Sequence, residues 1–139
     1  MKKINYRSAN TISGIIVSIF SFVVFSLTVE PTASYWDCAE YISTSAKLQV
    51  GHPPGAPLFQ MLGAIFSTFA FESDQIALSI NMMSVTSSAL TILFLFWSIS
   101  HLIKGFVSLK KNISIIEAIK IFGSSTLGLS LIHISEPRD

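Results

Sequence analysis

The chain has 139 residues, of which 50% are hydrophobic and 12% are charged, and its mean hydropathy is +0.61. Soluble domains carry about 25% charged residues, so half that fraction, with the apolar residues in long blocks, indicates an integral membrane protein. The net charge of +1 gives no reason to expect nucleic-acid binding, and the single cysteine, Cys38, excludes an intrachain disulfide and a cysteine-based zinc site.

The first apolar run covers residues 11–29 and contains no charge. At about 1.5 Å per residue a helix of this length rises roughly 28 Å, close to the hydrocarbon thickness of a bilayer. Lys2, Lys3 and Arg7 precede it, which favours a cytoplasmic N-terminus over residues 1–10. A cleaved signal peptide is the competing interpretation, but its apolar core usually has about 7–15 residues. We therefore expect a retained transmembrane span.

Three further apolar runs follow. Residues 56–71 form a short second span, and residues 75–100, which carry no charge, form a third. Residues 113–130 form a partial fourth span that carries Glu117 and Lys120 in its first turns, where they can pair at i,i+3. The sequence thus predicts an all-α integral membrane protein with three to four transmembrane helices.

Counting spans from a cytoplasmic N-terminus places residues 30–55 outside the cell (inner) membrane. The same count puts three lysines outside and two acids inside, against the usual bias of the flanking charges. These residues are Lys104, Lys110 and Lys111 outside, and Glu72 and Asp74 inside. A re-entrant segment at residues 56–71 would return the lysines to the cytoplasm. We keep the counted multi-pass topology as the expectation.

The external loop has features of a helix lying at the membrane interface. Pro31 ends the first span, and Gly51 with the prolines after it ends a helix expected over residues 34–49. Trp36 and Tyr41 fit the belt of aromatic residues at the headgroups.

Asp37 and Glu40 are three residues apart and so share one face of this helix. Beside a low-dielectric boundary the charged form of a carboxylate is disfavoured, which suits a general base, with or without a metal. The alternative is that both acids only complement the helix dipole from the first turn. Spacing alone does not decide between these two interpretations.

The turn at residues 52–57, HPPGAP, is rigid because proline fixes φ. It is either a stiff lip that brings His52 near the acids or an ordinary entry to the second span. Asp37, Glu40 and His52 together could bind a divalent cation, although their spacing matches no standard signature. Lys47 either contacts a phosphate or extends to the lipid headgroups.

The runs WDCAEY at residues 36–41 and KLQVGHPPGAPL at residues 47–58 resemble a specific loop motif. It is typical of a family of large polytopic membrane proteins, abundant in Bacteroidota, that is similar to a vertebrate transmembrane protein O-mannosyltransferase of the GT-C glycosyltransferase class. The resemblance extends from about residue 12 to about residue 129. The chain has Ala39 where family members usually have glycine, which leaves both acids in place.

The resemblance implies transfer of a sugar, mannose by analogy, from a polyprenyl-phosphate donor to Ser or Thr hydroxyls of translocated proteins. Asp37 would then be the catalytic base and Glu40 the second carboxylate of the catalytic pair. His52, Lys47 and Trp36 would bind substrate, with His52 close to the donor phosphate. The partners expected are the bilayer, the lipid-linked donor and a protein acceptor. These residue roles rest on analogy with the family.

Residues 131–139 depart from the family pattern, and LIHISEP within them resembles an adapter-derived ending. We expect a non-native tail on the N-terminal fragment of a longer enzyme, inactive by itself. The alternative is a non-enzymatic polytopic membrane protein, such as a transporter piece or a scaffold subunit.

Overall fold

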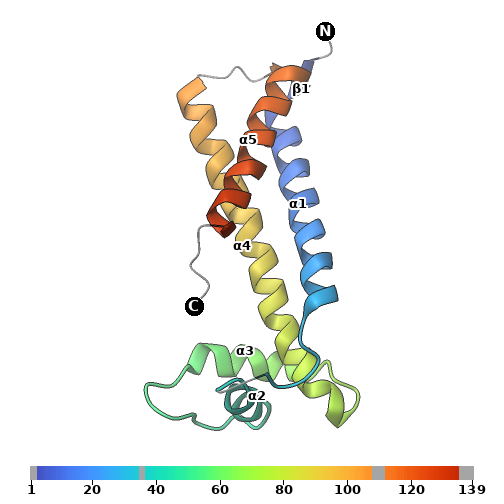
Figure 1. The fold of residues 1–139 in the computed structure, drawn as a ribbon, viewed down its shortest axis with the longest axis vertical. Helices are drawn as coiled ribbons and strands as arrows, with labels where there is room; N and C mark the ends of the chain where they lie inside the picture. The colour runs from blue at the N-terminus through green and yellow to red at the C-terminus, as the bar shows by residue number, and fades with distance from the viewer. Residues whose placement is uncertain (1–2, 35–36, 108–111, 135–139) are drawn as a thin grey trace. The chain divides into compact units, whose positions relative to one another are not determined.

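The computed structural model describes residues 3–34, 37–107 and 112–134, and these are mostly helical (Figure 1). The expectation of a helical fold is therefore confirmed, with one short antiparallel strand pair added to it. In chain order the elements are β1 (Lys3–Asn5), α1 (Tyr6–Thr28), α2 (Cys38–Ala46), α3 (Pro57–Ser67), the 3₁₀ turn η1 (Ser73–Gln75), α4 (Ile76–Val107), β2 (Asn112–Ser114) and α5 (Ile115–Ile134).

Two helices in the described part of the chain are long and apolar enough to cross a membrane. α1 has 23 residues and overlaps the predicted span at 11–29, and α4 has 32 residues and contains nearly all of the predicted span at 75–100. α1 leaves a row of large apolar side chains exposed, including Ile16, Phe20 and Leu27. Such a surface is expected where lipid is the solvent.

α3 is shorter than the span predicted over residues 56–71. It starts with Pro57 in its first turn and has 11 residues, a rise of roughly 17 Å. This is well short of the hydrocarbon thickness of about 30 Å, and the span over residues 56–71 stays a prediction. The helix gives way to turns in which the N–H groups of Thr68, Phe69 and Ala70 each bond to the carbonyl three residues back. α5 has 20 residues, and its role as a partial span stays a prediction.

The chain divides into two compact units, and the first comprises Met1–Ser21 and Ala89–Asp139. In it β1 pairs antiparallel with β2, so that Lys3 lies opposite Ser114. The Tyr6 hydroxyl donates to the carbonyl of Ser100 at 3.0 Å, and the Ser18 hydroxyl donates to that of Ala89 at 2.9 Å. The two contacts run in opposite order along the chain, so these parts of α1 and α4 are antiparallel. The buried cluster of this unit is Tyr6, Ile113, Ala118 and Ile121.

The second unit, Phe22–Ser88, holds α2 and α3. The two helices approach closely, because a Cβ built on Gly63 would lie 2.8 Å from both Cβ and Oγ of Ser45. Only glycine allows this approach without a shift. The Asn81 amide at the start of α4 donates to the carbonyls of Glu30 and Thr32 at 2.8 and 3.0 Å, which anchors the segment that leaves α1.

Candidate functional site

α2 is shorter than the helix predicted over residues 34–49. It begins at Cys38 with Asp37 as its N-cap residue, and the Tyr41 N–H donates to the Asp37 carbonyl at 2.9 Å. The helix ends because Leu48 adopts a left-handed backbone conformation with a φ of 49°. The N–H of the next residue, Gln49, then donates to the Thr44 carbonyl at 2.8 Å. This closure resembles the left-handed caps that commonly end helices.

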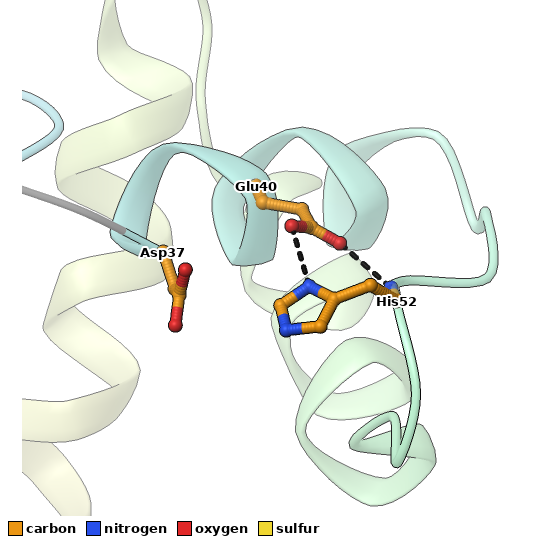
Figure 2. A group of neighbouring side chains, drawn as sticks. All are labelled: Asp37, Glu40 and His52. Atoms are coloured by element: carbon orange, nitrogen blue, oxygen red, sulfur yellow. Dashed lines mark hydrogen bonds and ion pairs between the residues drawn. The ribbon is translucent and has the colours of Figure 1, made fainter.

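Glu40 on α2 holds His52 by two hydrogen bonds (Figure 2). The backbone N–H of His52 donates to Oε1 of Glu40 at 2.8 Å, and Nδ1 of the His52 ring lies 2.7 Å from Oε2. The ring and the carboxylate therefore lie together although 12 positions separate them in the sequence. The prediction that the rigid turn brings His52 to the acids agrees with this geometry.

Asp37 lies on the same side of α2 as the His52 ring (Figure 2). Its exposed side chain makes no hydrogen bond that caps the helix. One ligand atom from each of Asp37, Glu40 and His52 lies within 4.8 Å of the others, so in the described part of the chain these three could ligate a cation together. In the geometry observed, however, both oxygens of Glu40 accept from His52. The arrangement is a hydrogen-bonded carboxylate–imidazole pair beside an unengaged carboxylate.

The pair shifts the ionisation of both its members. The hydrogen bond that the ring donates to Glu40 raises the pKa of His52 above its ordinary value of 6.5, and the charges of Glu40 and, to a smaller extent, Asp37 act in the same direction. The His52 backbone N–H, followed by the ring, lowers the pKa of Glu40 below 4.5. Each charged form is thus favoured by the other.

The pair should make a contribution to stability that depends on pH. The part from His52 is complete below pH 6.5 and is lost as the pH rises through the raised pKa of the ring. The part from Glu40 is complete above pH 4.5 and is lost as the pH falls through the lowered pKa of the carboxyl. We expect an NMR titration of His52 with a midpoint above 6.5 that returns toward 6.5 in Glu40→Gln but not in Asp74→Asn. A wild-type midpoint at or below 6.5 would contradict the pair.

Of the other predicted substrate-binding residues, Lys47 does not join this group. Lys47 is the C-cap of α2, at the opposite end of the helix from Asp37, and a separation of ten residues along a helix is about 15 Å. Trp36 lies outside the described residues. Gln60, which adjoins the loop before His52, was not predicted; a lone amide in the uncharged run of residues 56–66 was the signal that could have identified it.

A cavity of about 410 Å³ adjoins the first turn of α2. Its walls are mainly apolar and aromatic, and the polar groups include the Asn81 amide and the hydroxyls of Tyr41 and Ser84. The lining residues are Cys38, Tyr41, Ile42, Ala56, Phe59, Asn81 and Ser84. The rings of Tyr41 and Phe59 meet edge to face at 5.3 Å and connect α2 to α3 on this side. The cavity therefore suits an apolar chain with few polar groups.

The comparisons with known proteins agree with the loop motif. The family model described as the N-terminal domain of protein O-mannosyl-transferase TMEM260 matches residues 37–136. A protein O-mannosyl-transferase tmem260 of Dictyostelium discoideum is 32% identical over 92 residues, which are 65% of this chain and 11% of that relative. A protein O-mannosyl-transferase TMEM260 of Mus musculus is 32% identical over 88 residues, 62% of this chain and 12% of the relative.

The similarity to a protein O-mannosyltransferase expected from the loop is thus confirmed. The matched range begins at Asp37 and includes Glu40 and His52. The chain spans only a small part of the length of these two relatives. No solved structure matches it.

Proposed function

This chain belongs to the family defined by the N-terminal domain of protein O-mannosyl-transferase TMEM260, and we propose that it supplies the acceptor-activating loop of a membrane protein O-mannosyltransferase. Both relatives are named for that activity. Such an enzyme needs a sugar donor and a protein acceptor. The observation that best supports the proposal is the cluster of Asp37, Glu40 and His52, whose ligand atoms lie within 4.8 Å of one another.

In the proposed reaction Asp37 is the general base. Its carboxylate takes the proton from a Ser or Thr hydroxyl of the acceptor as the hydroxyl oxygen bonds to the anomeric carbon of the mannose. The bond from that carbon to the donor phosphate oxygen breaks, and the lipid phosphate leaves with its electron pair. Asp37 suits this role because it is exposed and no cap bond occupies its side chain. A positioned base must come within hydrogen-bond reach of the proton.

We assign His52 the role of binding the leaving phosphate. Nδ1 of its ring is engaged by Glu40, so Nε2 remains to donate outward, and the raised pKa keeps the ring protonated to higher pH. A cation at this place offsets the charge that develops on the phosphate. Glu40 is then the partner that orients and charges His52 rather than a second base.

We propose a polyprenyl-phosphate mannose as donor and the GT-C class for the enzyme. The cavity beside Cys38 and Tyr41 has the mainly apolar walls that a prenyl chain requires. A lipid-linked donor would bring its phosphate to the membrane surface. A nucleotide sugar carries no apolar chain to fill this cavity.

For the topology we propose that α1 and α4 both cross the membrane, with α2, α3 and η1 together on the external side. The pairing of β1 with β2 puts the chain before α1 and the chain after α4 on one side. Lys3 and Lys104 then lie on the cytoplasmic side together, as the positive-inside rule expects. The charge conflict of the counted topology disappears, because α3 no longer reverses the chain.

We propose that α3 lies in the outer leaflet rather than across it. Its exposed apolar residues recur at i, i+3, i+4 and i+7, so they form one face. These residues are Leu58, Met61, Leu62 and Ile65. The opposite face carries Gln60 and Gly63, which are buried. A short helix with one apolar face is typical of the membrane interface.

The test is a transfer assay on membranes that contain the protein expressed from its complete open reading frame. An acceptor peptide rich in Ser and Thr is offered in two separate reactions. One reaction contains labelled polyprenyl-phosphate mannose. The other contains labelled GDP-mannose, in detergent that prevents lipid-linked intermediates from forming. We expect label in the peptide from the lipid-linked donor alone. Transfer from GDP-mannose alone would overturn the proposed donor, and transfer from neither donor would favour the non-enzymatic alternative.

A further inference from the structure

Gln60 is a buried polar side chain on an apolar helix. It is 8% exposed, whereas its neighbours Leu58 and Met61 on the same helix are 71% and 63% exposed. An amide taken out of water costs free energy unless it is hydrogen-bonded. The buried Gln60 amide is therefore expected to have a hydrogen-bond partner.

The partner is Thr44. The Gln60 Nε2 donates to Oγ1 of Thr44 at 3.3 Å, and both residues are buried. The Thr44 hydroxyl in turn donates to the backbone carbonyl of Glu40 at 2.8 Å. A continuous chain of hydrogen bonds thus leads from α3 to the backbone of the residue that holds His52.

Gln60 also touches the loop that carries His52. A Cβ built on Gly51 would lie 2.9 Å from Nε2 of Gln60 and 3.2 Å from Oε1 of Glu40. The glycine therefore fits between the buried amide and the carboxylate with no room for a side chain. Gly51 directly precedes His52, so the wall formed by Gln60 sets where the His52 N–H meets Glu40.

We infer that Gln60 is a positioning residue for the Glu40–His52 pair, acting through the Thr44 hydroxyl on one side and the Gly51 backbone on the other. It does not touch substrate. Its contribution is to hold the loop and α2 at the separation at which both oxygens of Glu40 meet His52. The geometric part of this inference does not depend on the proposed function, whereas its consequence for catalysis does.

The first test reads the pair directly. Full-length protein labelled with ¹⁵N-histidine is studied in nanodiscs at about pH 6, where exposed carboxylates are mainly ionised. The His52 signal is assigned by its loss in His52→Asn. Wild type should show the low-field proton of a carboxylate-bound Nδ1–H. We expect Gln60→Leu, which has a similar volume but no amide, to lose that signal.

Two further variants test the two routes separately. Thr44→Val removes the hydroxyl that receives the amide, and Gly51→Ala pushes a methyl group between Gln60 and Glu40. Both should weaken the signal. Gln49→Leu, which removes an exposed glutamine of the same unit, and Gly105→Ala, which meets nothing within 4 Å, should leave it unchanged. Should Gln60→Leu fail to fold, as judged by its helical circular dichroism, Gly51→Ala decides the matter.

The second readout is catalytic and depends on the proposed function. In the mannosyl-transfer assay Gln60→Leu should lower kcat roughly 10- to 100-fold, as small misplacements of catalytic groups do, with KM for the donor little changed. Persistence of the Nδ1–H signal in both Gln60→Leu and Gly51→Ala would overturn the inference. If instead both variants lose the signal and wild type transfers no mannose, the proposed function fails while the positioning role stands.

Discussion

Replacing Asp37 by asparagine is expected to abolish mannose transfer while the protein still accumulates and inserts. Asparagine has nearly the same shape and is a good N-cap residue, so the start of α2 at Cys38 should be preserved. What the variant loses is the ability to accept a proton. General-base catalysis contributes roughly 10²–10⁴-fold, so the expected loss in kcat lies in that range. The measurement is label transferred per unit of membrane-inserted protein.

The matched control is Asp74→Asn, since Asp74 is an exposed acid in η1 of the same unit and lies outside the cluster. It should retain wild-type transfer. If Asp37→Asn retains it too, Asp37 is not the base. A poorly accumulating Asp37→Asn protein would instead give the acid a structural role.

Loss of activity in Asp37→Asn would also follow if Asp37 held a catalytic cation with Glu40 and His52. Chelation separates the two mechanisms. Because both Glu40 oxygens already accept from His52, we expect EDTA to leave transfer by the wild-type protein unchanged. Inhibition by EDTA that a divalent cation reverses would assign the cluster to metal binding instead.

The long helices were predictable because uncharged runs of span length leave few other solutions in a chain with 12% charged residues. The shorter run at residues 56–71 was ambiguous. Hydropathy alone does not separate a span from a short helix followed by turns, and the structure has α3 end at Ser67. The pairing of β1 with β2 could not be foreseen, because it joins three-residue segments more than a hundred positions apart.

The part of the candidate site that depends on local sequence spacing was predictable, and the part that depends on packing between helices was not. The i,i+3 spacing of Asp37 and Glu40 places them on one side of a helix wherever that helix lies. The approach of His52 depends on the left-handed turn at Leu48, which leucine does not signal. The role inferred for Gln60 depends on the packing of α2 on α3 at Gly63 and Ser45, a contact between helices that no local pattern records.

The second prediction concerns the membrane topology. Cysteine labelling tests it, because each position is either labelled or protected in intact cells. Cys38 is the single cysteine among these 139 residues, so the chain already carries one reporter at the start of α2. An impermeant maleimide should label it in intact cells. In a Cys38→Ser background, Glu72→Cys should also react from outside, whereas Gly105→Cys should react only after the membrane is permeabilised. Both positions are exposed, and Gly105 has open space where a Cβ would be.

The two candidate topologies give opposite results at both engineered positions. If α3 crossed the membrane, Glu72→Cys would be protected in intact cells and Gly105→Cys would be labelled. We expect the first pattern, because an 11-residue helix rises only about 17 Å and the pairing of β1 with β2 puts Lys3 and Lys104 on the same side of the membrane.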